Sequence, residues 1–142
     1  MYAIGIMSGT SLDGVDAALV NIEGRGVATK VSLIGFTTTE IPEQTKQEIR
    51  RAVKPPTGTV DLLCSLNFKL GYLFAEAAKS VCREARFPID EVDFIASHGQ
   101  TVWHIPKPDG EFARSTLQIG EPAVIAYETG VKVVSNFRTM DI

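Results

Sequence analysis

The sequence is poor in cysteine: only Cys64 and Cys82 occur among its 142 residues. Two cysteines do not make a disulfide framework. Both fall in one expected helix, where a separation of 18 residues spans about 27 Å at the α-helical rise. Disulfide-bonded cysteines have Cα atoms roughly 4.4–6.8 Å apart. We therefore expect two buried thiols that pack as small apolar side chains in a reducing compartment.

Long apolar runs and a strong charge of one sign are also missing. No stretch of 18 apolar residues is present, which argues against a membrane span. The net charge is −3, from 14 Lys and Arg against 17 Asp and Glu, so a basic nucleic-acid surface is not expected. The first residues lack the basic flank and apolar core of a signal peptide, which favours a cytoplasmic protein. Apolar residues make up 44% of the chain, as in an ordinary globular domain.

The pattern of apolar residues predicts an α/β fold with a mixed sheet. Three strands joined by glycine-containing turns form an expected antiparallel meander. A long amphipathic helix then leads to a strand that we expect to be parallel to the first. The expected strands are 2–7, 15–22, 30–38, 92–97 and 131–135, with a hairpin of 101–104 and 115–119, and the expected helices are 43–53, 59–85 and 121–129.

The turn after the first strand is the first candidate site. It combines glycines, hydroxyls and carboxylates in the order Gly9, Thr10, Ser11, Leu12, Asp13, Gly14, Val15, Asp16. Glycine lets the backbone approach a phosphate closely, and a carboxylate nearby can hold Mg²⁺. The loop is not a Walker A motif, because Val15-Asp16 replace the required Lys-Ser/Thr. The alternative from the residues alone is an ordinary hairpin turn.

Two further candidates follow expected strands. His98 can move a proton and Gln100 can bind a sugar hydroxyl, since ligands of open α/β sheets bind at the carboxyl ends of strands. Arg138 can bind a carboxylate or phosphate with two donors. The alternatives are a histidine in a polar turn and a solvated arginine. Near Glu121 an expected helix start either receives an anion or is capped by Glu121 itself.

A metal site is not expected among the remaining polar side chains. His98, His104 and Cys64 are irregularly spaced, and no second cysteine lies near them in the sequence. Trp103, the only tryptophan, either lines a pocket as a sugar platform or packs in the hairpin.

Four blocks together resemble the anhydro-N-acetylmuramic acid kinase family. They are MSGTSLDGVD (7–16), SHGQTVWH (97–104), STLQIGEP (115–122) and VVSNFR (133–138), in the order found in that family. The resemblance implies a ribonuclease-H-like fold of the actin/hexokinase type, with 1–142 as the N-terminal part of a two-lobed sugar kinase. In the wider superfamily an Asp often precedes the glycine pair, whereas this sequence has Met7-Ser8 there.

The resemblance also implies an activity. The family phosphorylates 1,6-anhydro-N-acetylmuramic acid with ATP and Mg²⁺ and opens the anhydro ring with water, giving N-acetylmuramic acid 6-phosphate in peptidoglycan recycling. By position, residues 9–16 correspond to the ATP phosphate-binding hairpin, and His98, Gln100 and Arg138 to the sugar side.

The same resemblance places the catalytic base beyond Ile142, the last residue of this chain. In the family the base is an aspartate from a later block, so we expect none among Asp13, Asp16 and Asp141. We expect residues 1–142 alone to be inactive, and the full-length protein to be a possible homodimer. The alternatives are a non-catalytic sugar- or nucleotide-binding module of the same fold and a purely structural domain.

Overall fold

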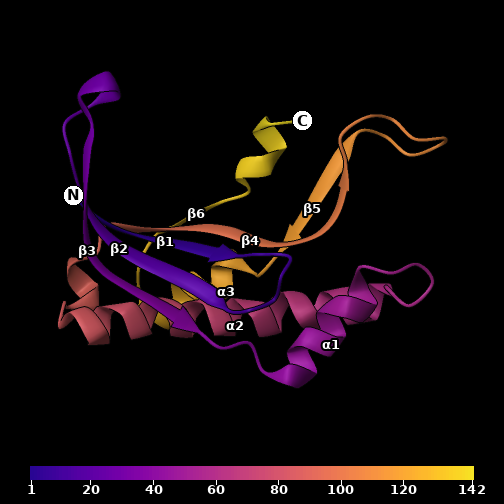
Figure 1. Cartoon of the computed structure of the whole chain (residues 1–142), viewed down its shortest axis with the longest axis horizontal. Coiled ribbons are helices and arrows are strands. Elements are labelled where there is room, and N and C mark those ends of the chain that lie inside the picture. Colours follow the sequence, from indigo (N-terminus) through magenta and orange to yellow (C-terminus); the bar gives the residue numbers. More distant parts are fainter.

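A computed structural model describes the whole chain, residues 1–142, as a six-stranded mixed sheet with helices packed against it (Figure 1). The strands are β1 (Tyr2–Ser8), β2 (Val15–Glu23), β3 (Lys30–Thr39), β4 (Phe94–Ile105), β5 (Ser115–Ile119) and β6 (Val133–Ser135). The helices are α1 (Glu43–Ala52), α2 (Val60–Ala85) and α3 (Pro122–Thr129), with short 3₁₀ turns at Gly26–Ala28, Ile89–Glu91 and Phe137–Met140.

The sheet has the strand order β3-β2-β1-β4-β5, with β6 paired to β4. β1, β2 and β3 pair antiparallel, which confirms the expected meander. β4 runs parallel to both β1 and β6, whereas β5 pairs with it antiparallel. The strand order and directions confirm the fold class expected from the sequence, a ribonuclease-H-like mixed sheet with flanking helices.

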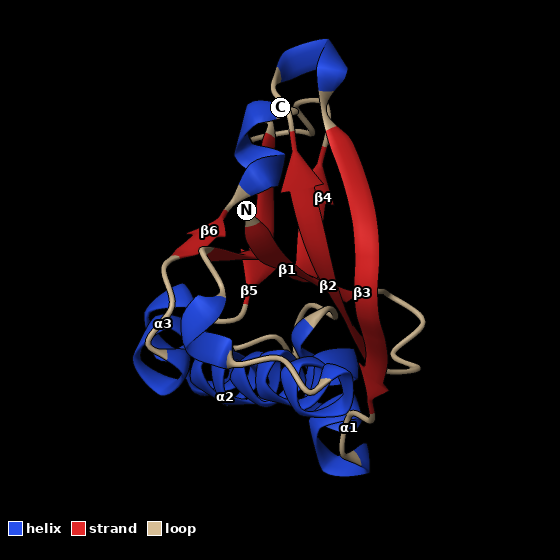
Figure 2. Cartoon of the chain, turned by 90° about the vertical axis from the view of Figure 1, so that its left-hand side faces the viewer, coloured by secondary structure: helices blue, strands red, loops and turns tan.

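The three α-helices lie on one side of the sheet (Figure 2). α2 provides the centre of the core, because its apolar stripe places Leu66, Leu70 and Phe74, all fully buried, in the cluster with Ile4 and Leu19 of the sheet. Large apolar side chains stay exposed on the edge strand β3, among them Val31, Leu33 and Phe36. No helix combines the length and apolarity needed to cross a membrane.

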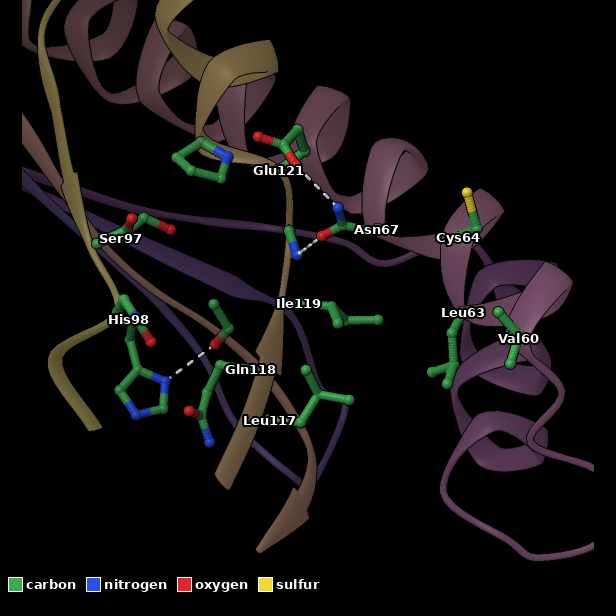
Figure 3. Close-up of a pocket in the computed structure, with 15 residues that line it drawn as sticks. Val60, Leu63, Cys64, Asn67, Ser97, His98, Leu117, Gln118, Ile119 and Glu121 are labelled. Atoms are coloured by element: carbon green, nitrogen blue, oxygen red, sulfur yellow. Dashed lines mark hydrogen bonds between the residues drawn. The ribbon is translucent and has the colours of Figure 1, made fainter. Parts of the chain in front are cut away.

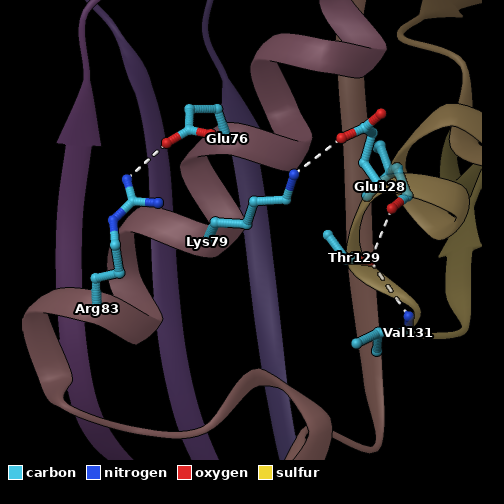
Figure 4. Close-up of polar contacts among 7 residues, drawn as sticks. Glu76, Lys79, Arg83, Glu128, Thr129 and Val131 are labelled. Carbon is cyan, nitrogen blue, oxygen red and sulfur yellow. Dashed lines mark hydrogen bonds and ion pairs between the residues drawn. The ribbon is translucent and has the colours of Figure 1, made fainter.

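α3 is held against α2 by close packing and by charge. A Cβ atom at Gly71 of α2 would lie 2.9 Å from the Glu121 carbonyl oxygen, so glycine at this position lets α2 approach the start of α3 closely. Lys79 of α2 forms an ion pair of 2.9 Å with Glu128 of α3 (Figure 4). Beyond the end of α3, the Val131 amide donates to the Thr129 hydroxyl at 3.3 Å. These contacts fix the chain that enters β6.

The structure corrects two details of the sequence analysis. β4 is one strand from Phe94 to Ile105, whereas we expected a strand at 92–97, a loop, and a new strand at 101. His98 and Gln100 therefore lie within β4 and not beyond its end. Cys64 is exposed, while Cys82 is buried as expected, and both thiols are free.

Candidate functional site

β4 changes its neighbour next to His98 and Gly99, and a cavity opens at that point. β6 pairs with residues 95–97 of β4, and β5 pairs with residues 100–105 on the same flank. Gly99 has φ +76°, and a Cβ atom there would lie 3.0 Å from the Ile119 carbonyl oxygen, so only glycine fits this junction without strain. The gap between the ends of β5 and β6 leaves a cavity of about 630 Å³.

Residues from α2, β4, β5 and the segment after β6 line this cavity (Figure 3). α2 contributes Val60, Leu63, Cys64 and Asn67. The opposite side is formed by residues 97–99 of β4 and by Ser135 and Asn136. A volume of this size is typical of a small-molecule site, for which the range is about 300–1,000 Å³.

His98 is held in one orientation by two hydrogen bonds. Arg138 Nε donates to His98 Nε2 at 3.0 Å, and His98 Nδ1 lies 2.9 Å from the Gly99 carbonyl oxygen. A guanidinium only donates and a carbonyl only accepts, so one tautomer satisfies both contacts: the neutral ring with its proton on Nδ1. The structure thus brings together two of the three residues expected at the sugar side.

Gln100 lies elsewhere. Its side chain is 1% exposed; its Oε1 accepts from Ser8 Oγ at 2.7 Å and its Nε2 donates to the Thr101 carbonyl oxygen at 3.2 Å. It lines a second cavity of about 320 Å³ beneath the loop after β1, together with Thr10, Ser11 and Leu12. Gln100 therefore lies beside the loop that we expected to bind phosphate, and its expected contact with the sugar stays a prediction.

Most hydrogen-bond donors of the loop after β1 have no partner within the chain. Of the backbone amides of residues 9–14, only that of Leu12 donates within the chain, to the Gly9 carbonyl oxygen at 3.3 Å. Thr10, Ser11 and Asp13 are exposed, and none of the hydrogen bonds of the chain uses the hydroxyl of Thr10 or Ser11. Leu12 has φ +60° and turns its side chain into the core, which fixes the bend. Backbone N–H groups that are free in a bend of this kind suit an anion.

The remaining residues of this loop have structural partners. A Cβ atom at Gly14 would meet the side chain of Thr38 and lie 3.0 Å from the Thr39 carbonyl oxygen. Glycine at position 14 therefore allows the end of β3 to pack closely against this turn. Asp16 accepts a hydrogen bond of 2.7 Å from the Thr38 hydroxyl. Val15 is fully buried. Nowhere in the chain do three His, Cys, Asp or Glu side chains lie close enough together to hold a metal ion by themselves.

The catalytic base that we expected beyond Ile142 concerns residues outside 1–142, so it stays a prediction. Within the chain, Asp141 next to Ile142 is exposed, and its Oδ2 lies 3.7 Å from Arg138 Nη1. Asp13 is exposed in the loop after β1, and Asp16 is bonded to Thr38. These positions give no reason to assign the base to any of the three aspartates.

Asn67 is a site residue that the sequence analysis missed. Its Oδ1 accepts from the Gly120 amide at 2.7 Å, and its Nδ2 donates to Glu121 Oε2 at 3.0 Å. Glu121 Oε1 in turn accepts from the Ala123 amide at 3.1 Å, so Glu121 caps α3 and leaves no free anion site there. The sequence does contain one indication of this role: Asn67 is a polar residue one helical turn after Leu63, on the otherwise apolar stripe of α2.

Two polar atoms beside the cavity have no partner. Ser97 Oγ and Gln118 Oε1 are buried and accept or donate no hydrogen bond within the protein. Both residues line the cavity, together with His98. Buried polar groups are normally paired, so such atoms next to a cavity point to a ligand or a water molecule.

The fold and this site define an α/β domain with a partly polar cavity at the point where the parallel pairing of β4 and β6 ends. Its sequence matches the family described as anhydro-N-acetylmuramic acid kinase over residues 1–142, and the chain belongs to this family. The resemblance inferred from the four sequence blocks is thereby confirmed.

Individual relatives agree with this membership. The chain is 62% identical to an anhydro-N-acetylmuramic acid kinase of Clostridioides difficile (strain 630) and 59% identical to one of Bacillus cereus (strain ATCC 10987 / NRS 248), each over all 142 residues. It spans 37% of the length of each of these relatives. Among solved structures it is similar to Thermus thermophilus RuvC, with a TM-score of 0.42 and 16% identity over 96% of this chain and 63% of that one.

Proposed function

We propose that the full-length protein carrying this chain transfers a phosphoryl group from ATP to 1,6-anhydro-N-acetylmuramic acid. Water opens the anhydro ring in the same reaction, and the product is N-acetylmuramic acid 6-phosphate, made in the cytoplasm during peptidoglycan recycling. The observation that carries the proposal is the set of free amide and hydroxyl donors in residues 9–14, in a chain that belongs to the kinase family.

The loop after β1 binds the ATP phosphates in this proposal. Phosphoryl transfer depends on positioning and on neutralising charge more than on covalent chemistry. The free amides and the hydroxyls of Thr10 and Ser11 donate to phosphate oxygens. Mg²⁺, when bound, offsets the phosphate charge, and Asp13 in the same loop would hold it directly or through water.

The sugar binds beside β4 and the segment after β6. Arg138 keeps its terminal guanidinium nitrogens available for the ligand, because its contact with His98 uses Nε and its pair with exposed Asp141 is long, at 3.7 Å. The neutral tautomer of His98 is fixed by the contact with Arg138. The base that deprotonates the attacking water comes from the part of the full-length protein beyond Ile142.

The test is ATP-dependent turnover of the sugar by the full-length protein, followed by phosphorus NMR or mass spectrometry of the product. A Ser11→Ala variant should bind ATP several-fold more weakly, since it loses one hydroxyl donor worth about 1 kcal/mol. The matched control is Ser32→Ala, an exposed serine on β3. Sugar or nucleotide binding without any turnover in the full-length protein would favour a non-catalytic binding module.

The isolated chain 1–142 should show no turnover, because it lacks the proposed base. Measurable kinase activity from residues 1–142 alone would contradict the proposed division of the active site.

A further inference from the structure

The 630 Å³ cavity has a polar end and an apolar end. Ser97, His98 and Gln118 lie at the polar end, and Val60 and Leu63 of α2 lie across from them (Figure 3). A ligand that fills this space must therefore present polar groups toward β4 and apolar surface toward α2.

The orientation of the Gln118 carboxamide defines what the polar end requires. Gln118 Nε2 donates to Thr116 Oγ1 at 2.8 Å and to Thr101 Oγ1 at 3.3 Å, so both amide hydrogens are used. Its Oε1 is buried and unpaired, and an amide oxygen only accepts. In this orientation of the carboxamide, the group that Gln118 lacks is a hydrogen-bond donor.

Ser97 adds a second unpaired group. Its residue is 1% exposed and its Oγ has no partner, although a hydroxyl can both donate and accept. Burying such groups without partners costs free energy, which a ligand recovers when it supplies the missing hydrogen bonds.

No cationic side chain lines the cavity itself, so the carboxylate of the sugar is left to Arg138, which donates to His98 at the polar end. Both oxygens of Glu121 already accept hydrogen bonds within the protein. The site thus differs from the loop of residues 9–14, whose free amides suit phosphate.

We propose that Ser97 and Gln118 are specificity-determining residues that recognise a neutral O–H or N–H donor of the sugar, while Val60 and Leu63 contact its apolar surface. This inference rests on the proposed function, because the ligand is the acceptor sugar of that reaction. In 1,6-anhydro-N-acetylmuramic acid the neutral donors are the C4 hydroxyl and the acetamido N–H.

The experiment pairs changes in the protein with changes in the ligand. Calorimetry on the full-length protein measures affinity for 1,6-anhydro-N-acetylmuramic acid, for its 4-deoxy analogue and for its N-methylacetamido analogue. The variants are Gln118→Met and Ser97→Ala, with Gln44→Met as the matched control at an exposed position of α1. Each of the two site variants should bind the natural sugar about fivefold to tenfold more weakly, as expected for one lost hydrogen bond.

Coupling between protein and ligand decides the outcome. One of the two analogues should bind the wild-type protein more weakly than the natural sugar does. Gln118→Met should bind that analogue no more weakly than it binds the natural sugar, because both changes remove the same hydrogen bond. Unchanged affinity in both site variants, or losses that simply multiply for both analogues, would overturn the inference and assign the cavity to ordered water.

Two checks keep the result interpretable. If Gln118→Met does not fold, Gln118→Glu can replace it, because glutamate retains a hydrogen-bond acceptor at this position. Ser97→Ala tests the cavity independently of Gln118. If the wild-type protein does not bind the sugar at all, the proposed function fails; if wild type binds and the site variants bind equally well, only this inference fails.

Discussion

Ser8 at the end of β1 donates a buried hydrogen bond of 2.7 Å to Gln100 Oε1 in β4. The two residues are 92 positions apart in the sequence. This contact fixes the start of the loop of residues 9–14 to the strand that also carries His98. The proposed phosphate and sugar sites are therefore joined through one strand, and the contact can be tested directly.

Ser8→Ala should lower the free energy of unfolding by about 1–3 kcal/mol, because it leaves the buried Gln100 Oε1 without a donor. Urea denaturation measures the change. The double variant Ser8→Ala/Gln100→Met should recover part of the loss, since it removes the unpaired oxygen as well. A Ser8→Ala variant as stable as Ser32→Ala would contradict this role for the contact.

Gly14→Ala should destabilise the protein by about 1–3 kcal/mol, as overpacking usually does. The added methyl group would meet Thr38 and the Thr39 carbonyl oxygen in β3. Gly9→Ala is the matched control, because a Cβ atom there meets only Ser11 Oγ at 3.5 Å. Equal thermal stabilities of the two variants would show that Gly14 does not serve packing. Gly9→Ala is consequently the cleaner variant for nucleotide titration.

Asn67→Ala should lower the free energy of unfolding by about 2 kcal/mol. The substitution leaves the Gly120 amide without its acceptor and Glu121 without one of its donors. Hydrogen exchange of the Gly120 amide should also become faster in this variant. Gln44→Ala removes a surface hydrogen bond to Glu48 and should change stability by less than about 0.5 kcal/mol. Unchanged protection of Gly120 in Asn67→Ala would exclude the proposed link between α2 and the start of α3.

The two thiols should differ in reactivity. Cys64 is exposed, whereas burial raises the pKa of the Cys82 thiol above its ordinary value of 9.0. A thiol reagent at neutral pH should therefore modify Cys64 quickly and Cys82 only as the protein unfolds. Because the raised pKa belongs to the folded state, the stabilising contribution of Cys82 is complete below pH 9.0 and is lost as the pH rises above it.

Denaturation of Cys82→Ala and wild type across this pH range measures that contribution. Equal labelling rates at Cys64 and Cys82 in the native protein would contradict the burial of Cys82.

Local patterns were sufficient to predict much of the fold. The meander follows from strands separated by glycine-containing turns, and α2 follows from apolar residues such as Leu66, Leu70 and Phe74 at three- and four-residue spacing. The loop of residues 9–14 was also found from its composition alone, because glycine, hydroxyl and carboxyl groups between two strands are recognisable without tertiary contacts.

Long-range pairing explains what the sequence could not predict. Residues 98–101 look like a turn, but β5 pairs with β4 from Gln100 onward and keeps them in one strand. Cys64 falls within the amphipathic helix, yet its side chain is exposed, because the arrangement of α2 against the sheet depends on contacts far apart in the chain. Asn67 was missed for the same reason: its partners lie 53 and 54 residues away.

β4 and β5 extend past the body of the molecule and are joined by residues 106–114, all of them exposed (Figure 1). The Asp109 and Phe112 backbones hydrogen-bond to each other within this connection, so it closes on itself without support from the sheet. Such a connection can change in length without disturbing the core. It is therefore the place to insert a short peptide tag when ligand binding is to be followed in the intact protein.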